Sequence, residues 1–294
     1  MKIRSITTAS GLSRALASPY PCAVSQLPQG SSGGPQERVA GHARTPRAVV
    51  REPVYEEPGV KLAEGVHAIG PSRRGQSQGG YSRAYLFEDD DGLTLVDTLW
   101  DEDAHMILEY LWSIGRTPDE LRHIVMTHAH RSHLGGLATL KALSGATVHS
   151  HAEEAPIIEG RRPAAKIPLT PVSPVQLVPI RIASQLGLFP HVPCAVDDRA
   201  LTEGSTVGSL RVLHMPGHTP GNLTVSWQGG RVLAVADIIM QWPSFSAGWP
   251  NFNRDETQFR ESLERVVELK PEVVCTGHGD PIWKNAGRIA QLRR

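Results

Sequence analysis

The sequence predicts an α+β fold in which two mixed β-sheets pack face to face and helices cover their outer faces. Three observations support this prediction. Short apolar runs typical of strands occur in both halves of the chain. Each half also contains amphipathic runs with the period of an α-helix. Finally, side chains that commonly bind metals stand directly after several strands, where a rigid scaffold presents functional groups.

Apolar spacing and turn residues place the individual elements. The strands predicted in the first half are Val66–Ile69 and residues 81–88, 93–97, 123–126 and 146–149. Helices are predicted over residues 101–114 and 134–143, and a further helix is predicted to start at Thr117 and Pro118. The second half has predicted strands over residues 210–213, 223–227, 232–236 and 273–275, and a helix over residues 255–269.

The composition changes along the chain. Residues 1–58 are rich in Ser, Pro, Gly and Ala, contain no acidic residue before Glu37, and lack the apolar stretch of a secretory signal. We expect a disordered or targeting-like extension there, and a folded domain over residues 59–294. Within this domain, residues 160–200 are rich in proline with weak periodicity. They are expected to form an insertion, either a cap over the site or a purely structural one.

Composition also limits the class of function. The chain has 294 residues, and its 30 basic and 30 acidic residues give a formal net charge of zero. Nucleic-acid-binding proteins normally show a basic excess, so we expect a small-molecule substrate instead. No run of about 18 apolar residues occurs, so we expect a cytoplasmic protein without membrane contact. The widely spaced Cys22, Cys194 and Cys275 favour incidental or buried thiols over disulfides or a zinc site.

Histidines gather where predicted strands end. The segment THAHRSHLGG directly follows the strand predicted over residues 123–126. With 13 histidines in the chain, one such placement is expected by chance. A larger set at four strand ends is harder to attribute to chance. The set consists of His128, His130, His133, His218, Asp237 and His278. Glycines beside His218 and His278 allow the tight turns that aim a side chain at a common point.

The motifs resemble those of a known family. THAHRSHLGG, PGHTPGN, the strand-end Asp237 and TGHGDPI are similar, in order and spacing, to the motifs of the metallo-β-lactamase-fold superfamily. The resemblance covers about residues 60–284 and implies a four-layer αβ/βα sandwich with a metal site along one edge of the sheets. It says little about substrate, because members include β-lactamases, lactonases, thioester hydrolases, sulfatases, nucleases and iron-dependent oxygenases.

The resemblance also implies a ligand set. His128, His130 and His218 would bind a first metal, His133 and His278 a second, and Asp237 would bridge the two. Three neutral imidazoles and an open position make a competent catalytic zinc site. The expected cofactor is therefore one or two zinc ions, with Asp237 as the catalytic carboxylate. Iron is an alternative.

The chain departs from the family's His-x-His-x-Asp-His motif at one position. Ser132 stands where an aspartate normally ligates the second metal and orients the attacking water. A serine hydroxyl is a poor ligand for such dications, and Arg131 adds a positive charge beside it, so we expect a weakened second site. Three interpretations stay open: an enzyme with one tightly held metal, one with two metals and another group filling the gap, and a protein that has lost hydrolysis. Ala236 also replaces the glycine that many relatives place before the bridging aspartate.

Several residues near the motifs allow two interpretations. The aromatic residues Trp242, Phe245, Trp249 and Phe252 either line an apolar substrate pocket or form packing or a homo-oligomer interface. Asp97 is expected to orient a ligating imidazole. Arg131 is expected to be solvated or ion-paired rather than bound to a substrate carboxylate. Ordinary structural roles are expected for His105, His123, His149, His151, His191 and His214.

These observations predict a metal-dependent hydrolase in which metal-activated hydroxide attacks the carbonyl of an ester, lactone, thioester or β-lactam. Relatives that cleave glutathione thioesters usually carry a helical C-terminal extension, whereas only residues 279–294 follow His278, which argues against that substrate. Two alternatives stay open. One is a mononuclear iron oxygenase that uses His128, His218 and Asp237 as a two-histidine, one-carboxylate site. The other is a catalytically impaired metal-binding protein.

Overall fold

The computed structural model describes residues 58–71, 82–90, 92–167, 175–249, 251–283 and 286–293. Residues 1–57, which include Cys22 and nearly all of the predicted extension, lie outside these ranges, as does Tyr81. The nature of the extension therefore stays a prediction. All described residues belong to one compact unit that spans Glu52–Arg294.

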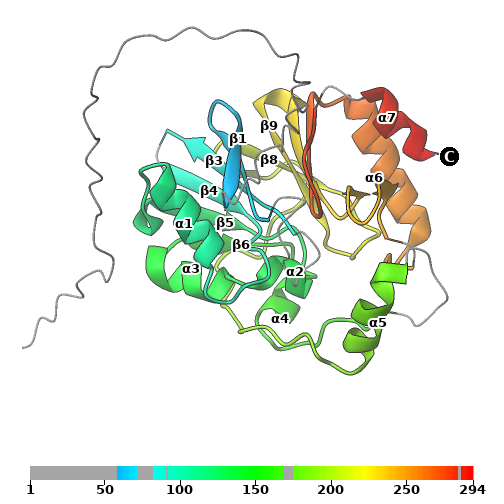
Figure 1. Cartoon of the computed structure of the whole chain (residues 1–294), viewed down its shortest axis with the longest axis horizontal. Coiled ribbons are helices and arrows are strands. Elements are labelled where there is room, and N and C mark those ends of the chain that lie inside the picture. Colours follow the sequence, from blue (N-terminus) through cyan, green and yellow to red (C-terminus); the bar gives the residue numbers. More distant parts are fainter. Residues whose placement is uncertain are drawn as a thin grey trace, which may run out of the picture. The chain divides into compact units, whose positions relative to one another are not determined.

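Two mixed six-stranded sheets form the centre of this unit (Figure 1). The first has the order β1 (Gly59–Ala63), β2 (Val66–Ile69), β3 (Ala84–Asp89), β4 (Gly92–Val96), β5 (Leu121–Val125) and β6 (Thr147–His149). The second has the order β14 (Ile282–Trp283), β13 (Val273–Thr276), β10 (Val232–Ala236), β9 (Leu223–Trp227), β8 (Leu210–His214) and β7 (Thr206–Val207). A small hairpin joins β11 (Ile239–Met240) and β12 (Ser246–Ala247).

Each sheet contains a parallel strand pair that brings loops to one edge. In the first sheet β4 pairs in parallel with β5, and in the second β10 pairs in parallel with β13. The carboxyl ends of parallel strands meet at the same edge of a sheet, so the residues that follow the two strands of each pair are neighbours. The loops after β4, β5, β10 and β13 carry Asp97, His128, Asp237 and His278 respectively.

Alternation along the strands builds the layers. In β3, Leu86 packs outward against helices, whereas Tyr85 and Phe87 face the second sheet. The outer layer on the first sheet is α1 (His105–Ser113) and α3 (Leu137–Ser144), and the outer layer on the second is α6 (Glu256–Leu269) and α7 (Ala286–Ala290), as Figure 1 shows. A third apolar cluster fills the space between the sheets. The predicted α+β class and the αβ/βα sandwich are therefore confirmed.

Three predicted helices differ from the observed ones. The helix expected from Thr117 is a single 3-10 turn, Pro118–Glu120, and β5 begins at the next residue. The helix expected over residues 101–114 starts only at His105. The helix expected over residues 134–143 is interrupted, and α2 (Arg131–Leu134) precedes α3. The N–H groups of Gly135 and Gly136 donate to the carbonyls of Leu99 and Thr98 instead of to the preceding turn, so the helical hydrogen bonding is interrupted here. A Cβ atom at Gly135 would lie 2.1 Å from the carbonyl carbon of Trp100.

The segment over residues 160–200 contains a 3-10 turn, Val175–Leu177, and the helix α5 (Val178–Gln185). Its described apolar residues Leu177 and Ile180 pack with Trp249 and neighbouring aromatic side chains. No local pattern predicted β1, β7, β11, β12, β14, α4 (Ala155–Ile158) or α7, which have two to five residues each. Such elements are too short for a hydrophobic period to develop.

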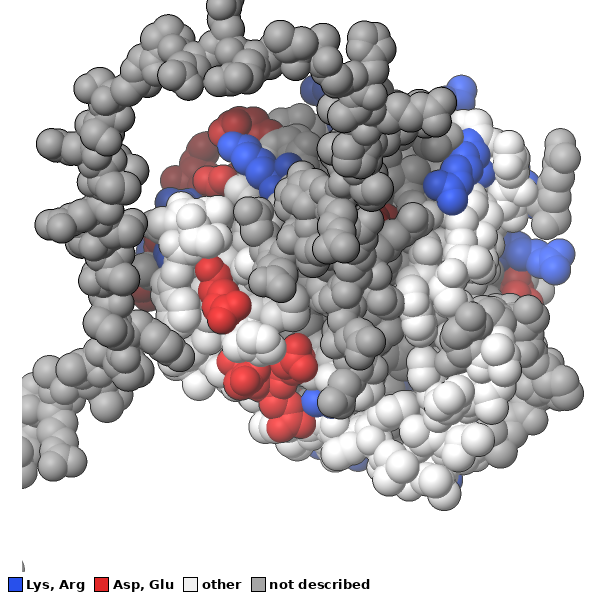
Figure 2. All heavy atoms as spheres, in the orientation of Figure 1, with Lys and Arg blue, Asp and Glu red and all other residues white. Residues whose placement is uncertain are grey.

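The described surface carries charges of both signs. On the face drawn in Figure 2, basic and acidic side chains occur among a large area of uncharged residues. This mixture agrees with the zero net charge of the whole chain. Within the described ranges, no helix has the length and apolar character needed to cross a membrane.

Candidate metal centre

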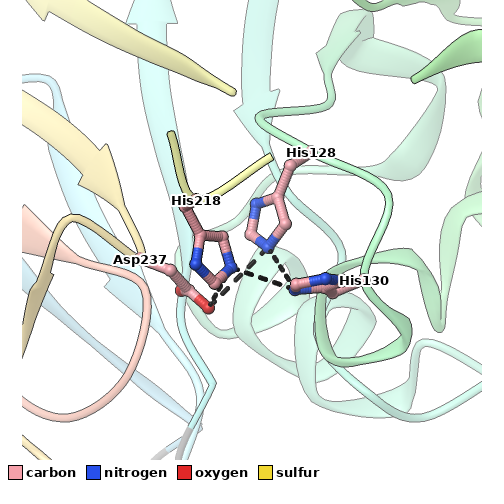
Figure 3. A group of neighbouring side chains, drawn as sticks. All are labelled: His128, His130, His218 and Asp237. Carbon is pink, nitrogen blue, oxygen red and sulfur yellow. Dashed lines mark hydrogen bonds and ion pairs between the residues drawn. The ribbon is translucent and has the colours of Figure 1, made fainter. Parts of the chain in front are cut away.

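The six predicted ligands come together at the common edge of the two sheets. Four of them, His128, His130, His218 and Asp237, form one group whose ligand atoms all lie within 4.8 Å of one another (Figure 3). A second group within the same limit consists of His133, Asp237 and His278. Asp237 belongs to both groups, so its carboxylate stands between two sets of imidazoles.

The first group has the dimensions of a tetrahedral metal site. The Nδ1 atom of His130 lies 3.1 Å from Nε2 of His128 and 3.0 Å from Nε2 of His218. The Oδ2 atom of Asp237 lies 3.4 Å from Nε2 of His218 and 3.7 Å from Nε2 of His128. Two nitrogen atoms bound to one tetrahedral zinc ion are about 3.3 Å apart, given zinc–nitrogen distances of about 2.05 Å. The three imidazoles and the carboxylate therefore fit one zinc-sized ion.

The second group also fits a metal ion, because two of its ligand atoms are buried without a hydrogen-bond partner among the described residues. His133 Nε2 lies 3.3 Å from Oδ1 of Asp237, and His278 Nε2 lies 3.6 Å from Oδ2. Both His133 Nε2 and Asp237 Oδ1 are buried, and neither makes a hydrogen bond to the described residues. An unsatisfied buried polar atom costs about 1–3 kcal/mol. A cation between these atoms would remove that cost, so the residues fit a second metal as well.

The protonation states of the first group suit metal binding. Burial lowers the pKa values of His128 and His130 well below their ordinary value, and it also lowers the pKa of His218. Burial raises the pKa of Asp237, but the imidazoles of His278 and His133 act more strongly in the opposite direction and hold it well below its ordinary value. Neutral imidazoles and an ionised carboxylate are the forms that ligate metals.

Asp97 orients His133 as the sequence suggested for a ligating imidazole. Its Oδ2 accepts a hydrogen bond from Nδ1 of His133 at 2.8 Å. The carboxylate also accepts from the main-chain N–H of Thr127 at 2.9 Å and from its hydroxyl at 2.7 Å. Burial lowers the pKa of His133, but Asp97 and Asp237 together raise it to about 10. The contact with Asp97 leaves Nε2 of His133 facing Asp237.

Two backbone features shape the position of Asp237. Ala236 has a φ of 49°, in the left-handed region that favours glycine. A non-glycine residue there costs about 1–2 kcal/mol, so β10 ends under strain directly before the ligand. Gly277, after β13, leaves room for the carboxylate, because a Cβ atom at this position would lie 2.1 Å from Oδ1 of Asp237.

Sequence reasoning missed Glu154, which ties two ligand loops together. Its side chain is buried, with Oε2 accepting from the N–H of Ala129 at 2.9 Å and Oε1 accepting from the N–H of Gly221 at 3.0 Å. Ala129 lies between the first two ligating histidines, and Gly221 follows the turn that carries His218. The only signal in the sequence was a pair of acidic residues after the strand predicted over residues 146–149. Such a pair does not indicate that one of its carboxylates ties two loops together.

Asn253 was also missed. Its Oδ1 accepts a hydrogen bond from Nδ1 of His218 at 3.3 Å, so Nε2 of His218 faces the other ligands. The residue lies in the loop before α6, far from His218 in sequence, and no local pattern marks it.

Of the aromatic residues proposed for a substrate pocket, Trp242 and Trp249 pack together near the centre, whereas Phe245 packs separately. The Trp249 ring centroid lies 4.4 Å from that of His278 and 5.8 Å from that of Trp242. Trp249 and Phe252 are buried with Leu177. The Phe245 ring carries the guanidinium of Arg288 at 4.0 Å. A pocket formed by Trp242, Phe245 and Trp249 stays a prediction.

The remaining predicted residues lie outside both ligand groups. Ser132 is half-buried, and Arg131 pairs with Glu102 at 3.1 Å while stacking on Trp100, so the ion-paired interpretation of Arg131 is confirmed. The thiols of Cys194 and Cys275 are free and buried, as predicted. None of the histidines assigned ordinary roles belongs to a metal-binding group within the described ranges.

A cavity of about 310 Å³ opens beside the first group. His130, the one half-buried ligand of the six, lies in its wall together with Ala129, Glu154, Thr219 and Arg254. Residues 162–165 of the segment proposed as a cap form another part of the wall. Of the six ligands, His130 is therefore the one that this cavity reaches.

The two-sheet sandwich and the paired ligand groups define a protein class with a metal centre at the sheet edge. Within that class, the profile of the metallo-beta-lactamase superfamily matches residues 78–278, and the chain belongs to this superfamily.

Several relatives share part of the chain. The probable metallo-hydrolase YflN of Bacillus subtilis is 27% identical over 55% of this chain and 66% of its own length. A hydroxyacylglutathione hydrolase of Methylobacillus flagellatus is 30% identical over 60% of this chain and 54% of its own length. The chain thus spans about half to two thirds of these relatives.

A solved structure confirms the fold. A metallo-beta-lactamase family protein from Thermus thermophilus superposes with a TM-score of 0.59 over 79% of each chain, at 22% identity.

Proposed function

We propose that this chain is a metal-dependent hydrolase that cleaves an ester, lactone, thioester or β-lactam at its carbonyl carbon. The observation that carries the proposal is the convergence of three imidazole nitrogens and the Asp237 carboxylate within 4.8 Å. A zinc ion bound there would lower the pKa of a water molecule towards neutrality and polarise the substrate carbonyl. The names of the relatives, a probable metallo-hydrolase and a hydroxyacylglutathione hydrolase, support hydrolysis as the reaction class.

The chain's own residues supply charge, orientation and access. Asp237 keeps its negative charge near neutral pH, which makes it the proposed catalytic carboxylate. Its Oδ1 lies near His133, whereas its Oδ2 lies near His278 of the second group and near His218 of the first. Asn253 fixes the ring of His218, and Glu154 fixes the loops on either side. Substrate reaches the carbonyl-binding position from the cavity beside His130, since the other five ligands are buried.

We further propose that one metal ion is held tightly in the first group and that a second is held more weakly. The second group contains two imidazoles and shares its only carboxylate with the first. Ser132, which replaces the motif aspartate, adds no charge there. Fewer anionic ligands give a weaker site for a hard or borderline dication.

The alternative iron oxygenase would use two histidines and one carboxylate and leave the other positions open. His130 argues against that arrangement, because its Nδ1 points at the same position as Nε2 of His128 and of His218. A third imidazole in this place favours zinc.

The proposal is tested with zinc-loaded protein on a panel of aryl esters, lactones, thioesters and β-lactams. We expect turnover of at least one class and a loss of about 100-fold or more in kcat for His218→Ala, since a ligand is removed. His105→Ala is the matched control, because His105 is exposed and its ring pairs with Asp103, away from both ligand groups. Absence of turnover on the whole panel at full zinc occupancy would contradict hydrolysis. Iron in the purified protein together with oxygen consumption would favour the oxygenase.

A further inference from the structure

The cavity beside His130 has the character of a subsite for a short substrate segment. Its wall includes the apolar side chains of Ile157, Pro163, Ala164 and Ala165. Its volume of about 310 Å³ is at the lower end of small-molecule pockets. A chain of a few carbon atoms would fit it while the reacting carbonyl stays at the metal ligands.

One charged side chain in this wall has no counter-charge among the described residues. Arg254 is exposed at the rim of the cavity, and its main-chain N–H donates to the carbonyl of Gly217 at 2.7 Å, which anchors it beside the loop of His218. Its guanidinium donates a hydrogen bond to the carbonyl of Lys166 at 3.2 Å. It forms no ion pair with any carboxylate in the part of the chain that the structure describes.

The other charged side chains of the wall each have a partner among the described residues. Arg162 lies 3.6 Å from the carboxylate of Glu153. Glu154 accepts main-chain hydrogen bonds with both of its oxygens. Arg254 is therefore the cationic side chain of the wall that has no carboxylate partner in the described part of the chain. The nearby carboxylates of Glu153 and Glu154 would repel a singly charged carboxylate less than they would repel a phosphate dianion.

We propose that Arg254 binds a carboxylate group of the substrate, so that the substrate class is an ester or related acyl compound with a free carboxylate a few carbons from the reacting carbonyl. The guanidinium offers parallel N–H donors to the two carboxylate oxygens, a geometry that lysine lacks. The segment over residues 162–165 covers the apolar carbons between the two ends. This inference rests on the proposed hydrolase function for the reaction but not for the binding.

Binding is tested first. Pentanoate and pentanamide are titrated into zinc-loaded protein, and their binding is measured by calorimetry or NMR. We expect pentanoate to bind and its Kd to rise at least 10-fold in Arg254→Gln, with an intermediate rise in Arg254→Lys. Arg265→Gln is the matched control, because Arg265 pairs with Glu203 and does not line the cavity. An unchanged Kd in Arg254→Gln, as expected if the carboxylate binds only the metal, would overturn the proposal.

The kinetic arm compares two aryl esters that differ only at the far end, a hydrogen glutarate and the corresponding glutaramate. We expect the ratio of their kcat/KM values to fall at least 10-fold in Arg254→Gln and to be retained in Arg265→Gln. A ratio that does not depend on Arg254 would overturn the inference. If neither ester is cleaved while pentanoate binding depends on Arg254, the carboxylate site is supported and the proposed hydrolysis fails.

Discussion

Substitution of Gly277 by alanine tests how the second sheet positions the shared carboxylate. The φ of Gly277 is outside the left-handed region, so alanine is allowed by the backbone. Its Cβ, however, would lie 2.1 Å from Oδ1 of Asp237, whereas ordinary van der Waals contact begins at 3.4 Å. The carboxylate or the strand that carries it must therefore move by about 1.3 Å.

A movement of this size is large compared with the tolerance of a metal–oxygen bond, which varies by about 0.2 Å. Loss of an outer partner of a metal ligand lowers affinity by about 10–100-fold. Displacement of a ligand itself should reach the upper end of this range. We therefore expect zinc affinity to fall about 100-fold, which corresponds to a loss of about 2.7 kcal/mol in binding free energy. Overpacking should also destabilise the fold by about 1–3 kcal/mol.

The assay is competition for zinc with a chromophoric chelator at fixed pH, together with urea unfolding of the zinc-free proteins. Gly287→Ala is the matched control, because a Cβ atom at Gly287 meets no atom of the described residues within 4 Å and should leave zinc affinity unchanged. The reasoning is refuted if Gly277→Ala binds zinc within about threefold of the wild-type affinity, well short of the 10–100-fold range.

Neighbouring contacts give three further predictions. Asp97→Asn replaces a carboxylate oxygen that accepts a hydrogen bond from Thr127 or His133 by an amide group that donates one. Because His133 belongs to the second group, the affinity for the second zinc ion should fall about 10–100-fold in the same competition assay; an unchanged affinity for that ion would contradict this. Glu154→Ala leaves the N–H groups of Ala129 and Gly221 without their acceptor and should lower the free energy of unfolding by about 2 kcal/mol in urea, with a smaller loss for Glu154→Gln; wild-type stability of both variants would exclude the role of Glu154. Zinc at 100 times its Kd should stabilise the fold by about 2.7 kcal/mol and raise Tm by about 5–10 °C; a Tm that does not respond would mean that the ligand groups do not hold zinc.

Much of the fold could be predicted because its signals are local. The hairpin of β9 and β10 and the helix α6 follow from apolar periods and from Asp255, whose side chain caps the first turn of α6. The break between α2 and α3 could not be predicted, because Gly135 packs against the main chain of Trp100, a tertiary contact. The helix predicted to start here was wrong for a related reason. The helix-start signal at Pro118 is real, but the chain passes directly from one turn into a strand of the sheet.

The candidate site also contains some residues that the sequence could predict and others that it could not. Its metal ligands could be proposed because they stand at strand ends and match the motifs of a family. Asp97 could be proposed because it also follows a strand. Glu154, Asn253 and Arg254 could not, because each acts on a segment that is distant in sequence and none lies in a recognisable spacing. The covalent neighbours of a ligand are visible in a sequence, whereas the side chains that hold its ring or its loop depend on the complete fold.

The number of zinc ions bound per chain, with the affinity of each, tests the central claim most directly. Zinc-free wild-type protein and Ser132→Asp are titrated in parallel. We predict one tightly bound ion in the wild type, a second ion bound at least about 10-fold more weakly, and a second ion that binds more tightly once residue 132 is a carboxylate. Two equally tight ions in the wild type, or the absence of any tightly bound ion, would contradict the account.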